Sequence, residues 1–302
     1  MCEEIKNIDS NPFYGMKIDD ASILNRLEGR SPCPKCGKSR KYFCYTCYVP
    51  VKELEGHIPK LKLPLKIDII KHKREIDGKS TAIHAAILAS NDVQIYTYPD
   101  IPNYTEEEKT VLIFPSATSV PISDIFNDNY KKRNPDEGLQ KGYHYGTMLR
   151  SPISETITDK NQQSISELPI TKAVFIDSTW SQSRGIYQDY RIQKLKCVVL
   201  QNRISQFWRY QKGSPRWYLA TIEAIHQFLL ELHILMWGVS DKYLGLQNLG
   251  LGTKLEHYSK QDVIDNYTGQ YDNLLFFFKH MYDIIHKLYE HDALKSYKRP
   301  IF

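Results

Sequence analysis

The stretch Ala173-Val174-Phe175-Ile176-Asp177-Ser178-Thr179-Trp180 places an acid, two hydroxyls and an indole directly after a short apolar run. Consecutive apolar residues without alternation are typical of a strand that is buried on both faces of a sheet. Ligands of parallel sheets bind at the carboxyl ends of the strands, so the stretch predicts a functional site there. A second interpretation stays open, in which Asp177 or Ser178 caps a helix through Trp180-Ser181-Gln182.

Strand and helix signals alternate on both sides of this stretch. Apolar, β-branched runs predict strands, and helical spacing of apolar residues predicts helices. The expected strands are 65–71, 93–98, 111–114, 173–176 and 197–200, and the expected helices are 80–90, 218–237 and 271–289. This alternation predicts an α/β fold with a mostly parallel sheet.

Changes in composition divide the chain into four parts. Residues 1–29 form an arm, residues 30–64 a Cys-rich module with a Pro-punctuated linker, residues 65–292 the α/β domain and residues 293–302 a tail. Within the α/β domain, residues 129–168 are rich in Asn, Asp, Lys, Gln and Ser and contain few apolar side chains. This stretch is longer than an ordinary connection, so we expect a flexible insertion.

The chain shows no signal for a membrane or for secretion. No apolar run approaches the roughly 20 residues that span a bilayer. The segment Met1-Cys2-Glu3-Glu4 lacks the basic and apolar regions of a signal peptide. We therefore expect an intracellular, reducing setting and no membrane partner.

The net charge of +5 is distributed unevenly. Residues 30–75 contain twelve Lys or Arg against four Asp or Glu, so the remainder of the chain is slightly acidic. A basic region on a near-neutral body is typical of a protein that binds a polyanion. A solvated Lys-rich face is the alternative.

Cys33, Cys36, Cys44 and Cys47 form two Cys-x-x-Cys pairs separated by seven residues. Each short turn places two sulfurs on one side, so two such turns can surround one tetrahedral Zn²⁺. Disulfide pairing is the alternative, and the intracellular setting disfavours it. Four Cys ligands leave no coordination position for water, so we expect the zinc to be structural.

Residues 203–218 combine four basic and five aromatic side chains without an acidic one. Guanidinium groups on phosphates and rings stacked on unpaired bases are the two components of single-stranded or loop RNA binding. Aromatic residues before a buried helix are equally often core. The candidate RNA-binding residues are Arg203, Trp208, Arg209, Lys212 and Arg216.

The segment Thr221-Ile222-Glu223-Ala224 begins the helix that follows. The first turn of a helix offers free N–H groups and the positive end of the helix dipole, which suit a carboxylate or a phosphate. Glu223 fits either a ligand-binding role or a capping role.

Taken together, these segments resemble the DTW-domain family of tRNA-uridine aminocarboxypropyltransferases. The resemblance extends over roughly residues 30–290 and is specific as a combination. Besides the four Cys, it rests on Asp77-Gly78-Lys79-Ser80-Thr81-Ala82-Ile83-His84, Leu112-Ile113-Phe114-Pro115, Phe175-Ile176-Asp177-Ser178-Thr179-Trp180, Phe207-Trp208-Arg209, Leu219-Ala220-Thr221-Ile222-Glu223-Ala224-Ile225 and Gln270-Tyr271-Asp272-Asn273-Leu274-Leu275-Phe276-Phe277. Ala220 departs from the family, which often has Ser there.

The resemblance implies a catalytic domain similar to the knotted SPOUT class, with S-adenosylmethionine (SAM) held at the knot. It implies transfer of the 3-amino-3-carboxypropyl group of SAM to N3 of a D-loop uridine in tRNA, with release of 5′-methylthioadenosine. The family also suggests a nuclear location, with the cytoplasm as the alternative.

The site residues that the resemblance implies centre on Asp177. This carboxylate is expected to act as the base that removes the N3 proton, or alternatively to hold the ammonium of SAM. The cofactor-binding residues are expected to be Pro115, Ser178, Thr179, Trp180, Leu219, Thr221 and Glu223. The competing functions are a SAM-dependent RNA methyltransferase and a zinc-containing tRNA-binding protein without catalysis.

Overall fold

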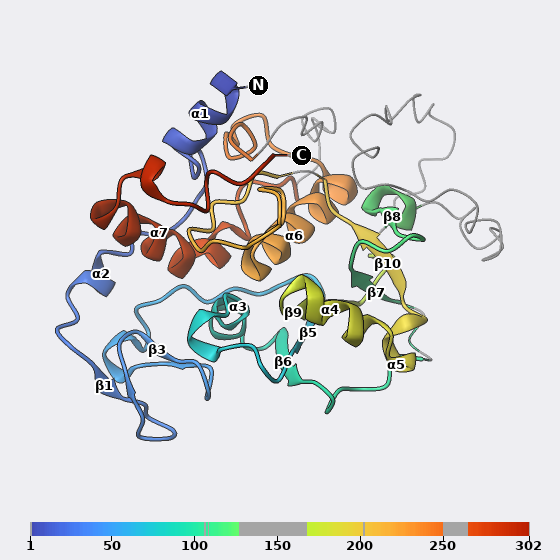
Figure 1. Ribbon diagram of the computed structural model, residues 1–302, viewed down its shortest axis with the longest axis horizontal. Helices are drawn as coiled ribbons and strands as arrows, with labels where there is room; N and C mark the ends of the chain where they lie inside the picture. The colour runs from blue at the N-terminus through green and yellow to red at the C-terminus, as the bar shows by residue number, and fades with distance from the viewer. Residues whose placement is uncertain are drawn as a thin grey trace.

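A computed structural model of the chain describes residues 2–105, 107, 109–126, 168–201, 203–249 and 265–301. Helices cover both faces of a central sheet, and a small module built on two hairpins lies at one side (Figure 1). The predicted insertion at 129–168 falls almost entirely outside the described residues.

The central sheet has six strands, and every strand pair within it is parallel. The strand order is β6-β5-β9-β7-β10-β8. The strands are β5 (Lys66–Lys71), β6 (Val93–Thr97), β7 (Thr110–Ile113), β8 (Val120–Pro121), β9 (Lys172–Asp177) and β10 (Lys196–Val199). The predicted α/β class with a parallel sheet is therefore confirmed. The pattern missed β8, which has two residues and so carries no periodicity.

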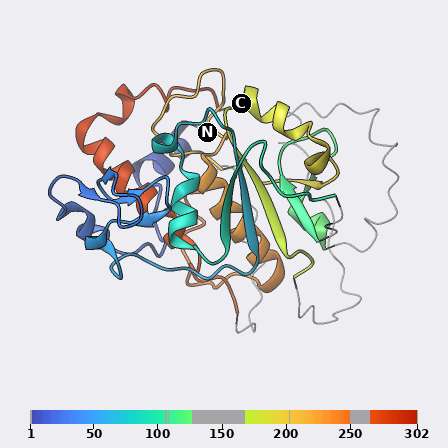
Figure 2. The same cartoon turned by 90° about the horizontal axis from the view of Figure 1, so that it is seen from below.

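The sheet is buried on both faces, as the unbroken apolar runs predicted. In β9, Ala173 and Phe175 belong to one apolar cluster, whereas Val174 belongs to the other. The larger cluster packs against α3 (Ala82–Leu88), α6 (Thr221–Trp237) and α7 (Phe276–Leu288), and the smaller one against α4 (Trp180–Tyr187) and α5 (Tyr190–Gln193). Figure 2 shows the strands between these two sets of helices.

The chain before the sheet forms an arm and the hairpin module. The arm contains α1 (Cys2–Ser10) and α2 (Ser22–Asn25). The module pairs β1 (Ser31–Pro32) with β2 (Ser39–Arg40) and β3 (Phe43–Cys44) with β4 (Val49–Pro50), both antiparallel. Two hairpin-like turns are thus present where the Cys spacing predicted them.

The opening stretch forms the end of a strand followed directly by the start of a helix. The strand β9 ends at Asp177, and α4 begins at Trp180. The N-cap of α4 is Thr179, so the expectation of a cap at Asp177 or Ser178 was wrong. The side-chain oxygen of Gln182 accepts the Thr179 N–H at 3.2 Å and fixes this first turn.

Candidate active site

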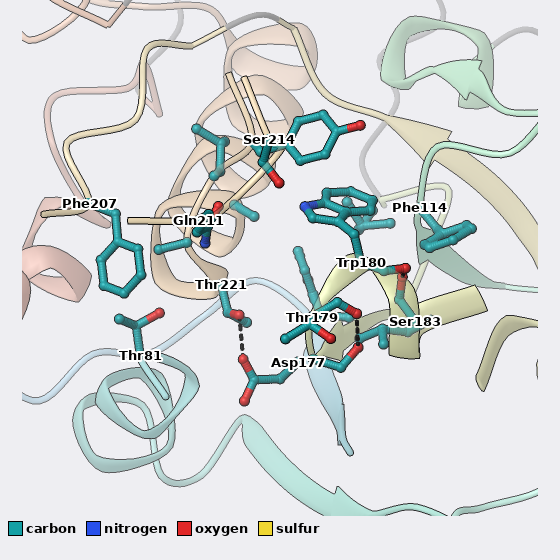
Figure 3. A pocket seen from close by; sticks show the side chains of 18 of the residues that line it. Thr81, Phe114, Asp177, Thr179, Trp180, Ser183, Phe207, Gln211, Ser214 and Thr221 are labelled. Carbon is teal, nitrogen blue, oxygen red and sulfur yellow. Dashed lines mark hydrogen bonds between the residues drawn. The ribbon is translucent and has the colours of Figure 1, made fainter. Parts of the chain in front are cut away.

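The site forms where the central strands end. Lys71 of β5 pairs with Asp177 of β9, and Ile113 of β7 pairs with both Phe175 and Val198. This register brings the segments after four strands to one edge of the sheet. They surround a cavity of about 600 Å³, a volume typical of small-molecule sites. Figure 3 shows Asp177 and Trp180 facing Gln211 and Ser214 across it.

Most of the expected cofactor residues line this cavity. Pro115 follows β7, the Ser178-Thr179-Trp180 segment follows β9, and Leu219 and Thr221 come from the start of α6. They are far apart in sequence and are brought together by the parallel strand order.

Asp177 lies almost buried at the base of the cavity, with 5% of its surface exposed. The Ser80 hydroxyl donates to Oδ2 at 2.7 Å, and the Thr221 hydroxyl donates to Oδ1 at 2.6 Å. Burial raises the pKa of this carboxyl above its usual value, and the two hydrogen bonds oppose the rise. Each oxygen keeps a further lone pair, so the group can still accept a hydrogen bond from a bound cation.

An aromatic wall lies beside Asp177. The Trp180 indole is 36% exposed, and its ring centroid lies 4.2 Å from that of Tyr218 and 6.4 Å from that of Phe114. All three residues line the cavity. A partly exposed indole held by neighbouring rings offers a fixed surface on which a planar base can stack.

Glu223 does not line the cavity, although the sequence placed it among the cofactor residues. Its side chain is fully buried and accepts hydrogen bonds from the Ser205 hydroxyl at 2.7 Å, the Gln206 N–H at 2.8 Å and the Ala220 N–H at 2.9 Å. The last of these bonds ties Glu223 to the residue before α6. Its geometry is that of the capping alternative.

The basic segment 203–218 divides between the cavity and the interior. Arg209 and Lys212 line the cavity. Arg216 is 2% exposed, and both of its terminal nitrogens donate to the Asp9 carboxylate, at 2.8 and 2.7 Å. Arg203 is 3% exposed and bonds His226 at 2.9 Å. Neither buried guanidinium can reach an RNA phosphate in this structure.

Trp208, the remaining candidate of that segment, is half-buried. Its ring packs at 5.2 Å from Phe278 and 5.3 Å from Phe207, measured between centroids. The indole therefore packs on the apolar core beside α7 and presents only part of its surface.

Sequence reasoning assigned no site role to several residues that line the cavity, among them Glu75, Lys79, Ser80 and Thr81. These four lie between β5 and α3. When two parallel strands are adjacent, the residues after one strand end lie beside those after the other. Knowing that β5 and β9 are neighbours would therefore have indicated these residues, but the sequence of a single strand does not predict which strand lies next to it.

The four Cys of the hairpin module form a second site. Their sulfurs all lie within 4.8 Å of one another, and those of Cys36 and Cys44 are 3.7 Å apart. Tetrahedral Zn²⁺ with Zn–S bonds of about 2.3 Å requires sulfur separations of about 3.8 Å. The residues after each pair, Gly37 and Tyr48, both adopt a left-handed backbone. The donor set and its spacing therefore fit a metal ion.

Comparisons with known proteins agree with this geometry. The DTW domain family model matches residues 41–286. A protein named tRNA-uridine aminocarboxypropyltransferase 1 from Xenopus tropicalis is 40% identical over 299 residues, which cover 96% of this chain and 90% of the relative. The human protein of that name is 41% identical over 282 residues, covering 91% and 84%. No solved structure matches the chain.

Among the described residues, no helix combines the length and apolarity needed to cross a membrane.

Proposed function

The chain belongs to the DTW-domain family, and we propose that it is a tRNA-uridine aminocarboxypropyltransferase. It moves the 3-amino-3-carboxypropyl group of SAM to a uridine of tRNA. The observation that carries this function is a cavity of about 600 Å³ at the strand ends, which contains a buried carboxylate beside an exposed indole. The names of the relatives supply the reaction class.

The cavity residues fit SAM by their chemistry. SAM carries a planar adenine, a sulfonium, an ammonium and a carboxylate. Trp180 with Tyr218 offers a ring surface for the adenine or a cation–π partner for the sulfonium. Pro115, Leu219 and Thr221 supply walls and main-chain groups near these rings. When bound, SAM supplies an electrophilic carbon next to a positively charged leaving sulfur.

The hydrogen bonds of Asp177 support a positioning role over a base role. Both oxygens already accept a hydroxyl hydrogen, and the carboxylate lies at the base of the cavity. A buried carboxylate held in this way provides a fixed negative charge for an ammonium, because little reorganisation is needed when the cation arrives. The orientation of SAM decides which carbon faces the nucleophile, so fixing the ammonium selects the reaction.

The tRNA surface is proposed to surround the mouth of the cavity. Arg209 and Lys212 line the cavity, and Trp208 lies next to them in sequence. The hairpin module is adjacent, because a Cβ added at Gly78 would lie 3.7 Å from the Tyr45 ring. The basic residues between 30 and 75 therefore extend the positive surface from the cavity toward the module, which suits a phosphate backbone.

Mass spectrometry of tRNA nucleosides tests the reaction directly. The protein is incubated with unmodified tRNA and SAM, and the nucleosides are weighed after digestion. The proposal expects a uridine that carries the aminocarboxypropyl group and an equal amount of 5′-methylthioadenosine. A methylated base would identify a methyltransferase, and an unmodified base with tight tRNA binding would identify a binding protein.

We propose that the Cys cluster holds structural Zn²⁺, since four sulfur ligands leave no position for a reacting water. Replacing Cys36 with Ser should release the metal and destabilise the module, and metal content per chain is measured by inductively coupled plasma mass spectrometry. Cys197→Ser is the matched control, because this buried thiol lies in β10, outside the cluster. Unchanged zinc in the Cys36 variant would refute the tetrathiolate site.

We also propose that the sheet is of the knotted SPOUT type and that residues 65–292 form one catalytic domain. Most residues between Phe207 and Thr221 line the same cavity as the ends of β7 and β9, so the chain crosses those ends between β10 and α6. A knot requires such a crossing. A crystal structure with SAM tests whether the chain passes through a loop of its own backbone, and a path that does not would exclude the knot.

A nuclear location, carried over from the family, is tested by fluorescence microscopy of the tagged chain.

A further inference from the structure

A second carboxylate, that of Glu75, lines the cavity and has no part in the proposed binding of the ammonium. Glu75 lies four residues after Lys71, the last residue of β5, in the loop that connects β5 to α3. Its N–H donates to the His72 carbonyl at 2.9 Å, and the Ser80 N–H returns to the Ile76 carbonyl at 3.2 Å. The loop is therefore folded on itself and fixes the direction in which Glu75 leaves the strand.

Parallel pairing places this loop beside Asp177. Lys71, the last residue of β5, is in register with Asp177 at the end of β9, and the His72 N–H donates to the Asp177 carbonyl at 3.0 Å. Glu75 and Asp177 consequently line the same cavity from neighbouring strand ends.

The environment of Glu75 differs from that of Asp177. Among the described residues, no hydrogen bond to the Glu75 side chain is found, and the side chain is half-buried. Burial raises the pKa of this carboxyl, the charge of Asp177 adds to the rise, and Lys79, Lys71 and Arg209 oppose it. A raised pKa brings a carboxylate closer to the range in which it accepts a proton effectively.

Arg209 connects this carboxylate to the proposed RNA surface. Both residues line the cavity, and the charge of Glu75 is the one that favours the charged form of the half-buried guanidinium. A nucleotide whose phosphate contacts Arg209 would therefore bring its base near Glu75.

We propose that Glu75 is the general base that removes the N3 proton of the target uridine, while Asp177 holds the ammonium of SAM. This assignment rests on the proposed function. It divides between two carboxylates the two duties that a single one would otherwise have to combine. Glu75 lines the cavity, and among the described residues its side chain has no hydrogen bond, whereas the oxygens of Asp177 are already engaged by Ser80 and Thr221.

The proposed step conserves protons and electrons. The Glu75 carboxylate takes the N3 proton, and the N3 electron pair forms a bond to the γ-carbon of the aminocarboxypropyl chain. The bond from that carbon to sulfur breaks, and its electron pair stays on sulfur, which gives neutral 5′-methylthioadenosine. The carboxyl proton then passes to solvent, and no further reactant is required.

The first test replaces Glu75 with Gln in the full chain. Loss of a general base is expected to lower kcat by about 10²-fold or more, while SAM affinity by calorimetry and tRNA affinity by filter binding stay within about threefold. Glu290→Gln, an exposed acid outside the cavity, is the matched control and should behave as the wild type. A kcat within threefold of the wild type would overturn the assignment, as would a loss of SAM affinity as large as that of Asp177→Asn.

The second test uses a tRNA that contains 5-fluorouridine at the target position, because fluorine makes the N3–H more acidic. The Glu75→Gln variant is expected to gain rate on this tRNA relative to normal tRNA, and the gain should exceed that of the wild type. Glu75→Asp, which keeps a carboxylate, should retain intermediate activity. Equal effects of fluorine on variant and wild type would exclude proton removal by Glu75. A wild type that forms no aminocarboxypropyl uridine would instead refute the proposed function itself.

Discussion

Two buried aspartates, Asp177 and Asp272, illustrate the difference between a functional and a structural polar group. Asp272 is fully buried and accepts hydrogen bonds from the Lys17 N–H at 2.7 Å, the Tyr267 hydroxyl at 2.7 Å and the Tyr243 hydroxyl at 3.0 Å. His226 adds a bond at 2.9 Å. Asp177 accepts two hydroxyl hydrogens and faces a cavity.

The two pKa directions follow from these surroundings. Burial raises both pKa values, but the four donors around Asp272 outweigh it and lower the pKa of that carboxyl below its usual value. At Asp177 the two hydroxyl bonds leave the pKa raised. A saturated carboxylate stabilises the fold, whereas an unsaturated one beside a cavity retains capacity for a ligand.

Replacing Asp177 with Asn should produce the largest change. Turnover of tRNA is expected to fall by about 10³-fold, because the amide carries no charge for a bound cation. The free energy of unfolding should change by less than about 1 kcal/mol, since the Ser80 and Thr221 hydroxyls can rotate to meet an amide. Steady-state kinetics and urea denaturation measure the two effects. Lost stability without lost turnover would make Asp177 a structural group like Asp272.

Replacing Asp272 with Asn should affect stability instead. The Lys17 N–H and the protonated Nε2 of His226 cannot become acceptors, because Arg203 donates to His226 Nδ1. In either orientation of the introduced amide, its NH₂ group would therefore face a donor that cannot accept a hydrogen bond. We expect a loss of about 3 kcal/mol at pH 7, measured by urea denaturation.

The same substitution has a defined pH dependence. The folded pKa of Asp272 lies below the unfolded value, so its stabilisation is complete above the unfolded pKa and is lost as the pH falls through the folded pKa. The stability gap between wild type and Asp272→Asn should therefore narrow below about pH 4. A gap that stays constant down to pH 2 would contradict the ionised form of Asp272.

Arg209 and Arg216 allow the same comparison between a cavity residue and a buried one. Arg216 forms a two-point ion pair with Asp9 in the interior, so Arg216→Ala should lower the free energy of unfolding by about 2 kcal/mol. Thermal and urea denaturation measure this loss. Cavity residues should not respond in this way, so Arg209→Ala is expected to unfold within about 0.5 kcal/mol of the wild type.

Arg209→Ala should act on tRNA binding, with the smallest effect of the series. Tight tRNA binding is expected to weaken about fivefold, and the slope of log affinity against log salt should decrease by about one contact. Filter binding at several salt concentrations measures both quantities. Exposed Lys298→Ala, which is outside the cavity, is the matched control. An unchanged slope for Arg209→Ala would remove this guanidinium from the RNA surface.

The sequence predicted those secondary-structure elements whose apolar residues form a clear run or repeat at regular spacing. Apolar, β-branched runs predicted β5, β7, β9 and β10 within about two residues, and the helical spacing predicted α6. Cys spacing predicted the two hairpins of the module. Local pattern predicted the site at Ser178-Thr179-Trp180, which directly follows a strand, whereas Pro115, Leu219 and Thr221 were expected only from the family resemblance.

Contacts between distant segments could not be predicted. Arg209 and Arg216 belong to one basic segment, yet one lines the cavity and the other meets Asp9, 207 positions away. The composition of the segment does not distinguish these two arginines. Glu75 was missed for the same reason, because its place beside Asp177 follows from strand order, which local pattern does not encode.

Calorimetry with two ligands that differ in the aminocarboxypropyl chain tests the central claim most directly. S-adenosylhomocysteine carries the ammonium that Asp177 is proposed to hold, whereas 5′-methylthioadenosine lacks the whole chain. Asp177→Asn should bind S-adenosylhomocysteine about 10²-fold more weakly than the wild type and bind 5′-methylthioadenosine with equal affinity. Equal losses for both ligands, or no loss for either, would contradict the role of Asp177 as the group that holds the ammonium.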